Sequence, residues 1–133
     1  MHKRNRLFVS IALIYGLLGG LIAIVRLLDP SLIPGNVPRA HGHIMLLGFV
    51  LMMIYGIALH VLPRFGGFPL YSEQMADWQL YSANAGLPLM IAGWLGWRDM
   101  LVMAGGVLTY GAIVLFGLNM ILTVRARGQG RAI

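Results

Sequence analysis

Three of the four histidines of this 133-residue chain, His41, His43 and His60, fall in one apolar stretch, residues 39–67. The stretch reads RAHGHIMLLGFVLMMIYGIALHVLPRFGG. Imidazole binds transition metals and haem iron, and ionisable side chains inside a membrane-spanning segment are costly and usually functional. The chain has no cysteine, so thiolate ligation is excluded and a metal would need histidine, methionine or oxygen ligands. These histidines are therefore the first candidates for a site.

The composition indicates a membrane protein. Hydrophobic residues make up 59% of the chain and charged residues 11%, and the mean hydropathy is +0.79. The net charge of +6 could suggest nucleic-acid binding, but the basic residues flank the apolar runs, as in HKRNR and VRARGQGR, instead of forming a patch. We therefore expect membrane lipid and no nucleic acid as a partner. Residues 7–28 are too long for the apolar core of a secretory signal peptide.

Spanning a bilayer takes about 20 apolar residues per helix, and four such segments are predicted, at about 7–28, 40–62, 79–97 and 101–124. The second is expected to end at Pro63, because proline disrupts a helix interior. The predicted fold class is an all-α membrane protein, a single four-helix transmembrane domain over residues 1–133. An even number of spans places both termini on one side.

The distribution of positive charge predicts that this side is cytoplasmic. Seven of the ten lysines and arginines then lie inside: Lys3, Arg4, Arg6, Arg64, Arg125, Arg127 and Arg131. Arg26, Arg39 and Arg98 lie outside. The predicted location is the inner membrane of a bacterium, crossed several times.

Helical geometry separates the histidines. A turn of 100° per residue puts His41 and His43 about 200° apart, so they face nearly opposite ways at the outer end of their span. Two metals, or one metal and one structural histidine, would suit them. His60 lies roughly 28 Å farther along the axis. It is either a further metal ligand or a residue that caps the inner end of the helix.

Arginines are predicted at the level of His41 and His43. Arg39, Arg26 and Arg98 could pair with the propionates of a haem lying along the helix, with imidazole holding the iron. Alternatively they extend toward lipid headgroups, and Arg26 could pair with Asp29 one turn later. Glycines such as Gly48 and Gly56 either allow close helix packing, which we favour, or leave room for a flat ligand.

With these residues the second span resembles the tenth helix of subunit I in the haem-copper oxidase superfamily, including its cbb3-type and nitric-oxide-reductase-like members. In that family the first histidine of an H-x-H pair ligates the high-spin haem and the second the low-spin haem. The resemblance implies these roles for His41 and His43. It extends to His60 and Pro63, which match a family histidine that is not an iron ligand and the proline after it. AHGHIMLLGF also resembles the second helix of the family, whose early histidine is the other low-spin ligand.

The chain also departs from the family. It has far fewer predicted spans, it lacks the His-x-x-x-Tyr and His-His copper motifs, and its acids are expected in loops or at helix ends: Asp29, Glu73, Asp77 and Asp99. Proton-pumping oxygen reduction is therefore not expected, and whether the chain is an enzyme stays open. The resemblance implies a membrane protein that binds haem b, for electron transfer to a redox partner or for binding a diatomic gas such as nitric oxide or oxygen.

A single chain has no histidine on another span that could form the second axial bond to the haem iron. A symmetric homodimer could supply it, or water or a methionine could, from among Met45, Met90, Met100 and Met103. Two alternatives contain no haem. One is a structural or assembly subunit of a membrane complex, and the other is a protein that handles copper or zinc through its histidines.

Overall fold

The computed structural model describes residues 2–128, so Arg131 of the predicted cytoplasmic set lies outside the described residues. The described chain is helical, as predicted, and its elements are α1 (Lys3–Leu28), α2 (Val37–His43), η1 (Ile44–Leu51), α3 (Met52–Gly66), α4 (Glu73–Leu95) and α5 (Asp99–Gly128). η1 is a π-helix, and α2, η1 and α3 follow one another without a break. They form one long helix, Val37–Gly66.

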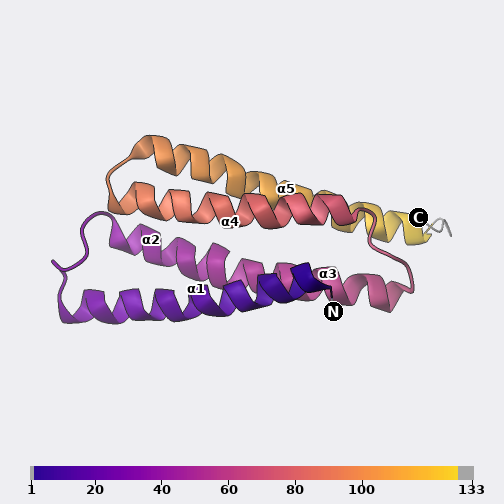
Figure 1. Cartoon of the computed structure of the whole chain (residues 1–133), viewed down its shortest axis with the longest axis horizontal. Coiled ribbons are helices and arrows are strands. Elements are labelled where there is room, and N and C mark those ends of the chain that lie inside the picture. The colour runs from indigo at the N-terminus through magenta and orange to yellow at the C-terminus, as the bar shows by residue number, and fades with distance from the viewer. Residues whose placement is uncertain (1, 129–133) are drawn as a thin grey trace.

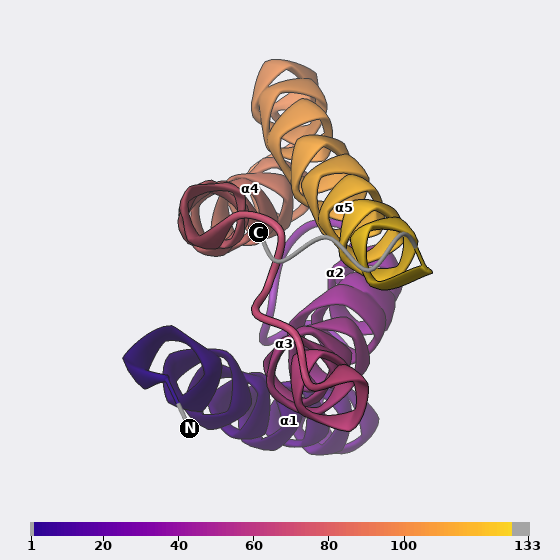
Figure 2. The same cartoon turned by 90° about the vertical axis from the view of Figure 1, so that its right-hand side faces the viewer.

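Two antiparallel helix pairs make up the bundle (Figure 1). α1 packs along the long helix, and α4 and α5 form the most extensive pair. Viewed along its axis (Figure 2), the bundle places the two pairs side by side. The long helix joins them, because α2 packs against α4 and α3 packs against α5.

The two ends of the bundle differ. Both ends of the described chain lie at one end, together with the loop between α3 and α4 (Figure 1). We call this the termini end (residues 2–6, 60–73 and 120–126) and the opposite one the His41 end (residues 26–41 and 94–100). Asn119 and Thr123 of α5 hold the α3–α4 loop at the termini end, since their side chains accept hydrogen bonds from the backbone N–H groups of Ser72 and Tyr71, each at 3.0 Å.

Among the described residues, three helices are long and apolar enough to cross a membrane: Lys3–Leu28, Val37–Gly66 and Asp99–Ala126. Large apolar side chains on them point outward, as with Leu17 (77% exposed) and Val107 (72%), which is the surface that lipid tails would cover. The third predicted span, residues 79–97, is also a helix, α4, but it is not among these three. Its first half carries Glu73, Asp77 and Gln79, which lower its apolar character.

The second helix begins earlier than its predicted start at residue 40. Asn36 caps it, with its side-chain oxygen accepting a hydrogen bond from the backbone N–H of Arg39 at 3.3 Å. Gly35 precedes the cap with φ 86°, and a Cβ there would lie 2.4 Å from the Cα of Leu95. The loop can therefore approach α4 this closely only with glycine at residue 35.

The prediction that this helix ends at Pro63 was wrong. Pro63 lies inside α3, which continues to Gly66, and Gly67 follows in the left-handed conformation (φ 69°) that commonly ends a helix. The third helix also begins before its predicted start at residue 79, because Ser72 caps α4 by accepting a hydrogen bond from the N–H of Met75 at 3.2 Å. Asp77, expected in a loop or at a helix end, therefore lies within α4.

The core lies mainly in the half of the bundle nearer the termini end. Tyr55 of α3 packs between Phe8 of α1 and Phe116 of α5, with ring centroids 5.5 and 4.8 Å apart. Phe8 and Tyr55 are almost completely buried. This aromatic group connects both helix pairs.

Candidate functional site

His41 projects from α2 toward α1. Its Nδ1 lies 3.0 Å from the backbone carbonyl oxygen of Gly19. A carbonyl only accepts hydrogen bonds, so Nδ1 carries the proton and Nε2 of the neutral ring keeps a free lone pair. A Cβ at Gly19 would lie 2.5 Å from the sulfur of Met45, so α1 and the long helix approach closely beside this contact.

An apolar cavity of about 280 Å³ lies beside this imidazole. Its walls come from the last turns of α1 and the first turn of α2: Ala23, Arg26, Leu27, Val37, Pro38 and His41. Arg26 is the only charged side chain in this lining. Apart from the His41 imidazole, the other lining side chains are hydrocarbon. Such a pocket, apolar with a few polar groups, is the usual form of a cofactor or small-ligand site.

His43 faces α4 instead. Its ring lies against the indole of Trp94, with centroids 4.3 Å apart, and its Nδ1 donates to the carbonyl of Arg39 one turn back, at 2.9 Å. The two rings therefore contact different helices, in keeping with their angular separation along α2. His43 does not line the cavity beside His41.

Regular α-helix ends directly after this pair. From Ile44 to Leu51 the long helix is π-helical, so the angular register of every later residue is shifted relative to His41 and His43. The π-helical segment packs closely between α1 and α4. A Cβ on Gly48 would lie 2.6 Å from Tyr15 of α1 and 2.9 Å from Leu87 of α4. π-helical turns are often found at functional sites, and the sequence pattern contained no signal for this one.

Of the three arginines assigned to this level, only Arg26 reaches the cavity. Its guanidinium donates to the carbonyl of Pro30, so the alternative pair with Asp29 is not formed. Ser31 binds the Asp29 carboxylate through its hydroxyl at 2.6 Å and its N–H at 2.8 Å. These hydrogen bonds, the hydroxyl first, hold the pKa of Asp29 below its ordinary value.

Arg39 and Arg98 are exposed at the His41 end. Neither lines the apolar cavity. The backbone carbonyl of Arg39 orients His43, and Arg98 lies in the turn between α4 and α5, with its N–H donating to Gly93 at 2.8 Å. Their side chains are free to extend toward lipid headgroups.

His60 lies at the termini end and lines a separate polar cavity with His2. It therefore does not join His41 and His43. Within the described residues, no three histidine, aspartate or glutamate side chains come together in a way that could hold a metal ion. A site at His41 would thus rely on a metal that brings most of its own ligands, as haem iron does.

The glycines near the histidines serve helix contact. A Cβ on Gly56 would lie 2.8 Å from the carbonyl of Asn5, and one on Gly16 would lie 2.9 Å from Phe49. Gly20, the second glycine of the GxxxG pattern, has no neighbour within 4 Å. Close packing, which the sequence favoured over space for a ligand, therefore explains Gly16, Gly48 and Gly56.

Sequence reasoning missed a buried ion cluster at the termini end. Arg4 was assigned to a row of cytoplasmic charges, but its side chain is only 3% exposed. It binds Glu73 at 2.6 Å and Asp77 at 2.9 Å, and it donates to the carbonyl of Glu73 at 3.1 Å. The signal available in the sequence was the spacing of the two acids, which places them on the same face of a helix.

We expect Arg4→Met to lower the free energy of unfolding by about 2–3 kcal/mol. Loss of one partner from a buried ion pair leaves the other charge uncompensated, and the half-exposed carboxylates reduce that cost. The measurement is denaturant unfolding of the detergent-solubilised protein. Arg6→Met is the matched control, because Arg6 is exposed on the same helix turn and should change the value by less than about 0.5 kcal/mol. Equal losses from both variants would contradict the cluster.

No family model matches this chain, and neither a curated protein nor a solved structure matches it significantly.

Proposed function

We propose that this protein is an integral membrane protein that binds haem b, with His41 as an axial ligand of the iron. One observation carries the proposal: the Nδ1–H of His41 donates to the Gly19 carbonyl beside an apolar cavity. Histidines that ligate metals usually donate their other ring N–H to a carbonyl or carboxylate, which orients the ring and fixes the tautomer.

The residues around His41 fit a porphyrin edge. Porphyrin supplies four nitrogen ligands, so the protein needs to add only one or two. Ala23, Leu27 and Val37 offer an apolar wall, and Arg26 at the same cavity can pair with a propionate. The surroundings of His43 do not fit, because its ring lies against the Trp94 indole and does not line the apolar cavity. We therefore assign the iron to His41 and the anchoring of α2 on α4 to His43.

The cavity of about 280 Å³ lies near the lower limit for ligand pockets, so a symmetric second copy would cover the remaining porphyrin and could provide the sixth ligand. The termini end carries Lys3, Arg6, Arg64 and Arg125, in favour of a cytoplasmic position for it in a bacterial inner membrane. The His41 end would then face outward.

Bound haem would supply one-electron chemistry or a gas-binding position. With a second protein ligand the protein would pass electrons between redox partners, and with an open position it would bind nitric oxide, oxygen or carbon monoxide. This chain's own part is to hold the iron, exclude water with the walls of the cavity and neutralise a propionate.

An absorption spectrum of the detergent-purified protein, oxidised and then reduced with dithionite, tests this proposal. The cells are grown with ample haem. We expect a Soret band in both states, with sharp reduced bands for six-coordinate iron or a shift with carbon monoxide for an open position. A colourless protein overturns the proposal. Stoichiometric copper or zinc in it would then indicate metal handling, and absence of any metal would favour an assembly subunit.

A further inference from the structure

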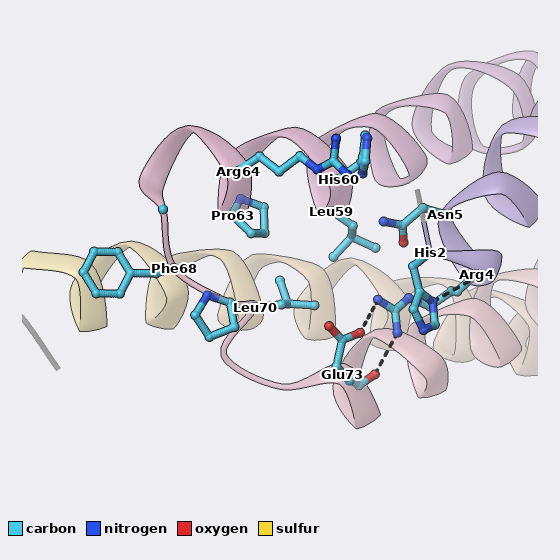
Figure 3. Close-up of a pocket in the computed structure, with 12 residues that line it drawn as sticks. His2, Arg4, Asn5, Leu59, His60, Pro63, Arg64, Phe68, Leu70 and Glu73 are labelled. Atoms are coloured by element: carbon cyan, nitrogen blue, oxygen red, sulfur yellow. Dashed lines mark hydrogen bonds and ion pairs between the residues drawn. The ribbon is translucent and has the colours of Figure 1, made fainter. Parts of the chain in front are cut away.

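A second cavity, of about 400 Å³, lies at the termini end between the start of α1, the end of α3 and the start of α4 (Figure 3). Its polar lining consists of His2, Arg4, Asn5, His60, Arg64 and Glu73. It is at the opposite end of the bundle from His41, so the proposed haem does not use these residues.

Two buried side chains in this cavity have polar atoms without a partner. Asn5 is 2% exposed, and its Oδ1 makes no hydrogen bond in the described structure; Arg4 is 4% exposed, and its Nε–H has no acceptor. Figure 3 shows the Asn5 amide and the Arg4 guanidinium projecting into the space between α3 and the start of α4. Buried polar groups are nearly always paired, because an unpaired one costs about 1–3 kcal/mol. A ligand oxygen in the cavity would accept from the Arg4 Nε–H, whereas the Asn5 Oδ1 is itself an acceptor and needs a donor such as a P–OH group.

The charges around the cavity favour an anion. Glu73 is the only acidic side chain in its lining, and its carboxylate is already bound to Arg4. Arg64 forms no ion pair among the described residues. The N-termini of α1 and α4 both lie here, and their macrodipoles add positive potential.

We propose that this cavity binds a phosphate group. Arg64 and His60 supply the cationic side, and the Arg4 Nε–H and the Asn5 amide donate from the buried side. A phosphate presents several acceptor oxygens in different directions, which suits donors that converge from two helices. The group could belong to an anionic lipid headgroup, with Pro63 and Phe68 of the lining beside its glycerol, or to free phosphate.

Thermal unfolding of the full-length protein in a maltoside detergent, which contains no phosphate, tests this site. The probes are inorganic phosphate and dihexanoylphosphatidylglycerol, each compared with chloride at equal ionic strength. We expect a saturable rise of the midpoint by a few degrees with at least one probe. A response to inorganic phosphate identifies free phosphate as sufficient, and a response to the lipid alone identifies the headgroup.

Matched variants locate the effect. Arg64→Gln and, separately, His60→Gln should abolish most of the rise, whereas Arg125→Gln should keep it, because Arg125 is also exposed at the termini end but does not line the cavity. His41→Ala should also keep it, so the result is independent of haem. The proposal is overturned if chloride reproduces the rise, if neither probe produces one, or if Arg64→Gln and Arg125→Gln respond alike.

Discussion

We expect His41→Ala to remove most of the haem from the purified protein. Its imidazole is the one we assign to the iron, and no other described histidine lines the cavity beside it. His43→Ala should keep most of the haem, since that ring lies against Trp94 on the other face of α2. The measurement is the Soret absorbance per mole of protein, with the pyridine haemochrome as a check on haem content.

His60→Ala is the control for this experiment. It replaces a histidine on the same long helix at the termini end, and it should leave the spectrum unchanged. Complete loss of haem from His43→Ala, with native helix content, would show that both histidines serve one shared haem site, whereas partial loss would fit the oxidase-like hypothesis of a different haem for each histidine. Loss from His60→Ala alone would mean that the iron lies at the other end of the helix.

A second large effect is expected at Gly105, where α5 touches α4. A Cβ at this position would lie 2.5 Å from the carbonyl oxygen of Gly86 and 2.6 Å from the backbone nitrogen of Met90. Backbone atoms cannot move aside without separating the helices. We therefore expect Gly105→Ala to lower the free energy of unfolding by about 3 kcal/mol, measured by denaturant titration in detergent.

The neighbouring glycine provides the comparison. A Cβ at Gly106 would have no neighbouring atom within 4 Å. Gly106→Ala should therefore be neutral or stabilise the helix by up to about 1 kcal/mol. Both variants add the same methyl group to the same helix. Equal effects would show that α4 and α5 do not pack as described.

Much of the architecture follows from local pattern. Long apolar runs broken by proline and glycine specified the helices, because each residue in lipid must satisfy its backbone within its own segment. The errors lay at helix ends. Pro63 did not stop α3, since the helix ends where Gly67 adopts a left-handed conformation, and α4 starts where Ser72 can cap it.

The polar contacts between helices were harder to predict from the sequence. Arg4 was expected among solvated basic residues, yet it is buried against Glu73 and Asp77, which are remote in sequence. A pair between Arg26 and Asp29 was one alternative, but Ser31 binds that carboxylate instead. In each case the partner depends on how neighbouring segments meet, which the order of residues along one helix does not reveal.

The sequence by itself determined the helical class, the membrane character and the opposed directions of His41 and His43, because these depend on composition and on 100° of rotation per residue. Only the tertiary structure decided that the Gly19 carbonyl accepts a hydrogen bond from His41, that Trp94 packs against His43, and that a polar cavity forms at the termini end. The physical reason is that such contacts join separate helices. They depend on which helices pack together and on the distance between the helix axes. Glycines at the helix contacts set that distance.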